Sequence, residues 1–392
     1  MMGAFVAALP LPYRYGNLIL IPLLLYWLAA GRYKNTLPLI KESAVIKLFV
    51  LFFGIVLLSI VTSENFNYRF SFIERYLGLL VFPLIFSSFQ LTTNDVSKLL
   101  KIFVVSCSVC AIYSLISTFI VYEMTPADLS IEENFGYFSW ILPETLNLKS
   151  NYYSWFVAFC LIIIVEIIFQ TPKRHVQILW LILFCFLFVF LGVLSSRTSF
   201  IAAVLILVIY FARLAIQHKF RVGKSLIIGI VVIGLALVSL QSPFLKAKIG
   251  GVITGGGQSD PRYILFQCGW QIFSENVLFG TGICDVEDLA LSCYKTFNDV
   301  EAIEKEYNFH NVFIQVGASM GIIGLTILIA LIIAIILRAK EVGRLTHIGF
   351  IVLFCFACTT ESLLTRNKGI SFFSTFSALL FILKPHEENT TC

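Results

Sequence analysis

The chain has 392 residues, of which 58% are hydrophobic and 13% charged, and its formal net charge is +5. Soluble domains contain roughly 45–50% apolar and 25% charged residues, so this composition excludes an ordinary soluble protein and predicts a polytopic membrane protein. The net charge is modest, and basic and acidic residues gather in different loops, so the charge gives no support to nucleic-acid binding.

An apolar run of about 17–25 residues can cross a bilayer as a helix, and the chain contains many such runs. We expect spans at residues 17–31, 45–62, 75–90, 98–121, 153–170, 177–194, 198–215, 224–240, 310–337, 346–360 and 368–383. The opening MMGAFVAALPLPYRYG is apolar but short and broken by proline, so it is either a half-length first helix or a re-entrant piece. The predicted fold class is all-α, a polytopic membrane protein with eleven or twelve transmembrane helices and one large outward loop.

Lys and Arg gather in alternate connections, which the positive-inside rule places in the cytoplasm. The acidic residues gather in the opposite set, above all in residues 122–151 and 241–309, which we expect to face outward. The second loop divides the chain into an N-terminal transmembrane bundle (1–240), the large outward loop (241–309), which faces the periplasm or the cell exterior, and C-terminal helices with a short tail (310–392). Within it, RYILFQCGWQIFSENVLF has apolar residues at helical spacing, which predicts an amphipathic helix along the membrane face.

The same loop holds Cys268, Cys284 and Cys293, and an oxidising compartment would permit a disulfide among them. We favour Cys284 with Cys293. Two C-x-x-C pairs lie inside predicted spans without nearby His or acidic ligands, so packing is the better interpretation than a metal or redox site.

On this topology His310, in NFHNVFIQVG, is the only one of five histidines that faces outward. On a helix, His310 would share a narrow arc with Gly317, Gly321 and Gly324, and so stand above a groove suited to a lipid tail. The plainer alternatives are a helix-end anchor for the histidine and close helix packing for the glycines.

Two arginines are expected on the same side. Arg197, in LGVLSSRTSF, lies in a short outward turn where a new helix begins, and a cation beside free backbone N–H groups suits phosphate. Arg262, in SDPRYILF, opens the amphipathic segment. Each could instead be an interfacial arginine resting among lipid headgroups.

Four segments in this order carry a family resemblance: LSSRTSF, DPRYILFQCGWQIFSENVLFGTG, HNVFIQVGASMGIIG and TTESLLTRNKGISFFSTFSALLF. Together they resemble the O-antigen ligase and O-antigen polymerase superfamily of bacterial membrane glycosyltransferases, over roughly residues 180–383. The resemblance implies transfer of a glycan from undecaprenyl diphosphate to a hydroxyl, either on the lipid A core sugar (ligase) or on another repeat unit (polymerase). It also implies a site that faces the periplasm from the bacterial inner membrane, contact with membrane lipids, and neither cofactor nor metal.

The resemblance also assigns roles. Arg197 and Arg262 match the family's arginine positions and would meet the charge on the departing diphosphate. His310 matches the family histidine, and would either remove the acceptor hydroxyl proton, with inversion at the anomeric carbon, or hold the acceptor while the substrate phosphate takes the proton. Glu361 and Arg366 flank the last outward turn; Glu361 could orient His310 or bind acceptor sugar, and a plain solvated loop is the alternative.

Arg69 and Arg75, near the first outward loop, could extend a cationic mouth. The competing class is a transporter of lipid-linked oligosaccharide, which should show paired discontinuous helices and polar residues near mid-membrane. The polar residues expected here lie at the outer edge, which favours chemistry at the surface.

Overall fold

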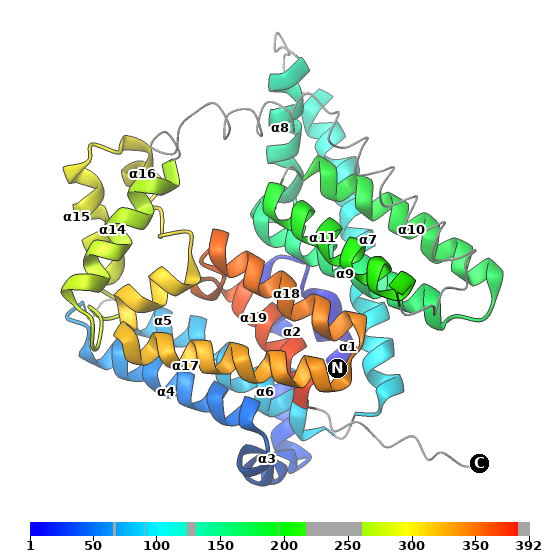
Figure 1. Ribbon diagram of the computed structural model, residues 1–392, viewed down its shortest axis with the longest axis horizontal. Coiled ribbons are helices and arrows are strands. Elements are labelled where there is room, and N and C mark those ends of the chain that lie inside the picture. The colour runs from blue at the N-terminus through cyan, green and yellow to red at the C-terminus, as the bar shows by residue number, and fades with distance from the viewer. Residues whose placement is uncertain (66–67, 90, 124–130, 195, 217–260, 383–392) are drawn as a thin grey trace. The chain divides into compact units, whose positions relative to one another are not determined.

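The computed structural model describes residues 1–65, 68–89, 91–123, 131–194, 196–216 and 261–382, and within these ranges it contains helices and no strand (Figure 1). Six helical stretches are long and apolar enough to cross a membrane: α4 (Ala44–Thr62), α5 with α6 (Arg69–Ser88), α7 (Thr93–Glu123), α9 (Ser150–Gln170), α10 (Arg174–Val193) and α17 (Val312–Val342). The all-α, multi-pass class is therefore confirmed for the described residues. The outward orientation of the large loop and the total of eleven or twelve spans stay predictions.

Three further predicted spans coincide with shorter helices: α2 (Tyr13–Ala29), α18 (Leu345–Thr360) and α19 (Asn367–Ser377), the last continued by η4 (Ala378–Ile382). α11 (Arg197–Ile216) matches the predicted span at 198–215. The opening segment forms α1 (Met2–Ala8), which ends before two prolines that have no backbone N–H to continue a helix. The predicted span at 224–240 and residues 241–260 of the large loop lie outside the described residues.

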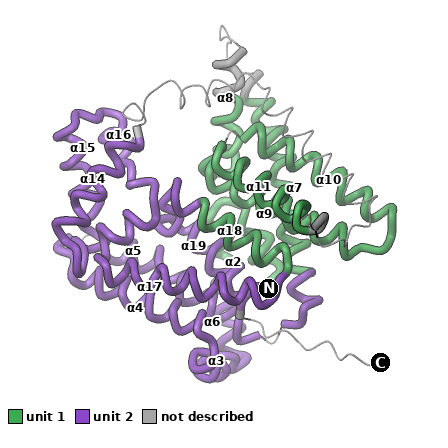
Figure 2. Tube along the Cα trace, viewed as in Figure 1, with its two compact units in different colours: residues 1–19, 98–254, 344–356 green, residues 20–97, 255–343, 357–392 purple. Residues whose placement is uncertain are grey.

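The chain divides into two compact units (Figure 2). Unit 1 comprises residues 1–19, 98–254 and 344–356, and α9 lies at its centre, packed against α10, α11 and α8 (Ile131–Glu144). Nearly every side chain of α9 is buried, as expected of a helix that is apolar on all sides. Its one acid, Glu166, accepts hydrogen bonds from the backbone N (2.7 Å) and Oγ1 (2.5 Å) of Thr346, so its charge is partly satisfied within the unit.

Unit 2 comprises residues 20–97, 255–343 and 357–392. Its long helices α4 and α17 pack side by side, and α19 packs against α6 (Gly78–Ser88). A group that we call the helical cap packs against α17 through α14: it consists of α14 (Pro261–Glu275), α15 (Val286–Thr296) and α16 (Val300–Glu304). The tripartite division at residues 240 and 309 stays a prediction.

The longest helix of unit 2 is broken near its beginning. Gly321 has φ +65° and ψ −166°, a conformation open to glycine and strained for residues with a Cβ. The break divides α17 into a short part before Gly321 and an uninterrupted part from Ile322 onward, and Figure 1 shows the change of direction between them. A break inside an apolar span requires other partners for the freed backbone groups.

The segment between α14 and α15 supplies those partners. The N–H groups of Thr281 and Gly282 donate to the carbonyls of Ala318 (2.9 Å) and Ser319 (3.0 Å). In return, Ile322 N donates to the carbonyl of Val277 (2.7 Å). The helical cap is thus joined to α17 through main-chain hydrogen bonds at the break.

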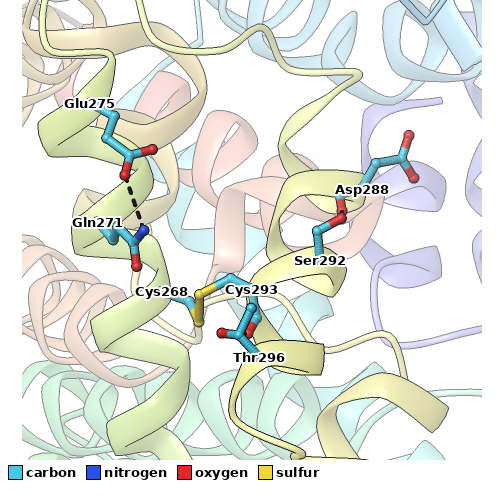
Figure 3. The surroundings of a disulfide bond; sticks show 7 residues. All are labelled: Cys268, Gln271, Glu275, Asp288, Ser292, Cys293 and Thr296. Atoms are coloured by element: carbon cyan, nitrogen blue, oxygen red, sulfur yellow. Dashed lines mark hydrogen bonds between the residues drawn. A yellow bond between two sulfur atoms is a disulfide. The ribbon is translucent and has the colours of Figure 1, made fainter.

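The disulfide of the cap joins Cys268 on α14 to Cys293 on α15, whose Cα atoms lie 5.8 Å apart (Figure 3). The predicted pair of Cys284 with Cys293 is therefore wrong. Packing of α14 against α15 places the partly buried Cys293 against the buried cluster that contains Cys268. The backbone N of Cys284 instead donates to Oγ of Ser63, directly after α4 (3.1 Å). Burial raises the pKa of the Cys284 thiol, so little thiolate is present to attack the disulfide.

We expect Cys293→Ser to destabilise the helical cap by about 3 kcal/mol, because the unfolded chain is no longer constrained by the closed loop. Limited proteolysis between α14 and α15 would measure the change as faster cleavage, with Cys284→Ser as the control because its thiol is free. Alkylation under denaturing, non-reducing conditions should modify Cys284 and spare Cys268. A protected Cys284 would contradict the observed pairing.

Candidate functional site

His310 lies in a tight turn immediately before α17. Its φ of +48° is in the left-handed region, where histidine and asparagine are found more often than most side chains. Asn308 Oδ1 accepts from His310 N (3.0 Å), and Asn311 Oδ1 accepts from the N–H groups of Phe313 (2.9 Å) and Ile314 (3.1 Å) as the N-cap of α17. Two asparagine side chains therefore hold the histidine outside the helix, in a conformation of the kind found at functional sites.

The side chain of His310 is paired with Glu361. Its Nδ1 lies 3.2 Å from Glu361 Oε2. The side chain of Glu361 is only 10% exposed and that of His310 20% exposed, so the pair is largely removed from water while the imidazole keeps an accessible edge. Glu361, directly after α18, is thus a neighbour of His310 and is not part of a solvated loop, and its role in orienting the histidine or binding acceptor sugar stays a prediction.

Arg262 completes a row of three side chains. Its Nη2 lies 3.8 Å from Glu361 Oε1, so one carboxylate lies between a guanidinium and an imidazole. Arg262 is 41% exposed, and an ion pair at this distance and exposure contributes little to stability. Its guanidinium therefore remains accessible to a bound anion.

Hydrogen bonds hold the two sequence segments of this site together. Asn311 N donates to Ser362 Oγ (3.2 Å), and Asn308 Nδ2 donates to Thr365 Oγ1 (3.5 Å). Arg75 Nη1 donates to the carbonyl of Thr365 (3.3 Å), so this predicted arginine does reach the segment. The turn before α17 and the chain after α18 form one structure, although about 50 residues separate them in sequence.

The other predicted arginines have separate surroundings. Arg366 is exposed between η3 (Leu363–Thr365) and α19, one residue beyond the contact of Arg75. Arg69 donates to the carbonyl of Ser63 at the end of α4. Arg197 is the first residue of α11, as predicted, and half-buried. Because Arg197 belongs to unit 1 and His310 to unit 2, a shared role for them stays a prediction.

The expected arc of glycines beneath His310 does not form. His310 is not helical, and Gly321 interrupts the helix on which the arc was drawn. A Cβ on Gly317 would lie 3.2 Å from the ring of Phe273 on α14, and one on Gly321 would lie 2.3 Å from the carbonyl oxygen of Leu278. Both glycines therefore permit close packing of the helical cap, and their predicted role in substrate binding stays a prediction.

Sequence reasoning missed the two asparagines that build the turn. The signal was present in NFHN, because Asn is a frequent N-cap and tolerates positive φ. A continuous helix from His310, as the spacing of apolar residues predicts, is therefore wrong for the first two residues, because α17 begins at Val312.

The row is suited to proton transfer beside an anion. A carboxylate that accepts from imidazole Nδ1–H leaves Nε2 as the nitrogen with a free lone pair, the arrangement required of a general base. Among the described residues, no group of three or more His, Cys, Asp or Glu could hold a metal ion. The expectation of metal-independent chemistry stays a prediction.

These helices and this polar row at the start of a span define a multi-pass membrane protein with a candidate acid–base site. Residues 181–329 match the family model described as O-antigen ligase. The resemblance to the O-antigen ligase superfamily is thereby confirmed over this segment, which contains Arg197, Arg262 and His310 but not Glu361. No curated protein matches the sequence. The family implies a membrane glycosyltransferase-like enzyme whose substrates are a lipid-linked glycan and an acceptor.

Proposed function

We propose that the protein is an O-antigen ligase that transfers a glycan from undecaprenyl diphosphate to a sugar hydroxyl of the lipid A core, at the periplasmic face of the bacterial inner membrane. The observation that carries this proposal is the row of Arg262, Glu361 and His310, two members of which lie in the segment that matches the family. At one end of the row, Arg262 suits the diphosphate of the donor. At the other end, His310 suits the hydroxyl of the acceptor.

In the proposed reaction, Nε2 of His310 removes the proton of the acceptor hydroxyl. The oxygen attacks the anomeric carbon of the donor sugar as the bond from that carbon to the diphosphate oxygen breaks, so the configuration inverts. The diphosphate leaves on the lipid carrier, and its charge is met by Arg262 and Arg197. Glu361 holds the imidazole in the required tautomer and stabilises the imidazolium that forms.

One structural feature, the discontinuous helix α17, would also be expected of a transporter. In transporters, the ends of broken helices face substrate or ion sites. Here the freed carbonyls of Ala318 and Ser319 accept from Thr281 and Gly282, and the break therefore anchors the helical cap. The observation favours an enzyme with a fixed structure above the span.

A deletion strain examined for its surface glycan tests the proposal and separates its two variants. A ligase deletion should leave long glycan chains on the lipid carrier and none on lipid A. A polymerase deletion should instead leave single repeat units attached to lipid A, which would favour the repeat-unit polymerase of the same superfamily. A normal surface glycan would exclude both.

We expect Arg197→Lys to lower transfer about tenfold or more although the positive charge is kept, because a lysine cannot form the two parallel hydrogen bonds of a guanidinium to a diphosphate oxygen pair. Glycan attachment in the variant strain would be measured against Arg213→Lys, which changes an arginine at the other end of the same helix. Equal activity of the two variants would make Arg197 an interfacial residue only.

A further inference from the structure

One exposed surface of the helical cap is apolar. On α14, Leu265, Cys268 and Ile272 are buried, whereas Tyr263 and Trp270 are 47% and 63% exposed. At 100° per residue, the two aromatic side chains project from the same side of the helix. Gln267, Gln271 and Glu275 are exposed beside this side. The exposed Ser274 lies on it, and its hydroxyl donates to the carbonyl of Gln271 (2.8 Å).

The chain that follows α14 continues the apolar surface. Val277, Leu278 and Phe279 are 45%, 62% and 68% exposed. Three consecutive apolar side chains with this exposure are unusual in water-facing loops and indicate a contact with lipid or with another molecule.

Main-chain contacts place this segment beside the span. The carbonyl of Val277 accepts from Ile322 N (2.7 Å), and the carbonyl of Leu278 packs against Gly321. Ile322 opens the uninterrupted part of α17. Residues 277–279 are therefore level with the end of an apolar membrane-spanning helix.

The apolar surface of α17 continues directly from this point. Four of its side chains are exposed along one side of the helix: Ile322, Ile329, Ile333 and Leu337. In a helix of 31 residues that contains an 18-residue stretch with a mean hydropathy of 3.1, we expect such a stripe to face lipid. Val277 and Leu278 meet the upper end of this stripe, so the two surfaces share one environment.

The direction of α14 fits the same environment. In Figure 1, α14 lies at the end of the unit where α17 begins and is steeply inclined to α4 and α17. A helix that is steeply inclined to membrane-spanning helices at their end lies along the plane of the bilayer, and Trp and Tyr are enriched at that depth.

We propose that Trp270, Leu278 and Phe279 insert into one leaflet of the bilayer, on the side where α17 begins, with lipid acyl chains as their binding partner. α14 then lies at the level of the headgroups, with its aromatic side in lipid and Gln267, Gln271 and Glu275 toward water. The helical cap is thus a membrane-embedded element and not a loop held above the surface.

Insertion of the helical cap also has a consequence for catalysis, and this consequence rests on the proposed function. Arg262 lies at the start of α14, and a 15-residue helix is about 22 Å long. A helix held along the membrane plane by Trp270 and Leu278 keeps Arg262 at headgroup depth throughout. That is the depth at which the diphosphate of a lipid-linked donor is located.

Tryptophan quenching by brominated lipid tests the insertion. The full-length protein would be reconstituted into vesicles of phosphatidylethanolamine and phosphatidylglycerol that contain phosphatidylcholine brominated on its acyl chains. The fluorescence of Trp270 is obtained as the difference between the unsubstituted protein and Trp270→Phe. In the Trp270→Phe background, Leu278→Trp reports on the segment after α14, and Phe279→Trp replaces it if the first variant does not fold.

Leu289→Trp in the same background is the matched control, because Leu289 is 42% exposed on α15 beside the acidic Glu287 and Asp288. We expect bromine on the acyl chains to remove most of the added fluorescence at position 278 and little at position 289. Equal quenching at the two positions would overturn the proposal. A blue-shifted emission at position 278 that lipid bromine does not quench would also overturn it, because protein would then cover the segment.

The readout does not depend on catalysis. Quenching at position 278 without glycan transfer would contradict the proposed function and leave the membrane insertion standing. Glycan transfer without quenching at position 278 would contradict the membrane insertion and leave the proposed function standing.

Discussion

Replacing His310 with alanine is expected to lower glycan transfer by about 10²–10⁴-fold, because the acceptor hydroxyl loses its general base. The substitution removes one hydrogen bond to Glu361, and the backbone turn keeps its support from Asn308 and Asn311. The variant should therefore insert into the membrane and accumulate normally. Glycan attached to lipid A, normalised to the amount of protein in the membrane fraction, measures the effect.

His175→Ala is the matched control for this experiment, because His175 is exposed near the start of α10 in the other unit. We expect it to retain full transfer. Activity retained by His310→Ala would remove both proposed roles of the residue, the base and the acceptor contact. Its position would then be explained as a helix-end anchor.

The second large effect is expected for Glu361→Gln, which keeps the shape of the side chain and removes its charge. A glutamine amide can donate a hydrogen bond to imidazole Nδ1, which stabilises the tautomer with its proton on Nε2 and leaves no lone pair for the acceptor. We expect transfer to fall by about 10²–10⁴-fold, the range expected for loss of a general base. A reconstituted assay with a lipid-linked donor would measure kcat and KM separately.

A positioning role for Glu361 predicts more than a loss of activity. Glu361→Asp keeps the charge and should recover part of kcat. Glu304→Gln, an exposed acid on α16, is the control. An unchanged kcat in Glu361→Gln would leave Glu361 a structural partner of Arg262.

The sequence was sufficient to predict the class of fold. Apolar runs longer than a bilayer is thick can be placed as helices without knowledge of their neighbours, because in lipid every backbone group must be satisfied within its own segment. The helix over RYILFQCGWQIF could be predicted in the same way, from its spacing of apolar residues. Arg262 and His310 could be selected as site residues because charge and imidazole are rare beside such runs and their surroundings resemble a known family.

The tertiary structure decided which of these residues meet. Glu361 was one of several polar candidates until its carboxylate was found 3.2 Å from His310 and 3.8 Å from Arg262, contacts between segments that lie about 50 and 100 residues apart. The partner of Cys293 likewise depended on the packing of α14 against α15, which no cysteine spacing reveals. Local pattern determines whether a segment is helical, whereas contacts between distant segments depend on how the helices pack.

The turn at His310 likewise depends partly on local pattern and partly on contacts between distant segments. An apolar run that follows a histidine predicts a helix from hydropathy alone, and that prediction is correct from Val312 onward. The two residues before it are held out of the helix by the side chain of Asn308 and by contacts with Ser362 and Thr365. Hydropathy alone therefore locates the beginning of this helix, whereas contacts between distant segments place the histidine in front of it, beside Glu361.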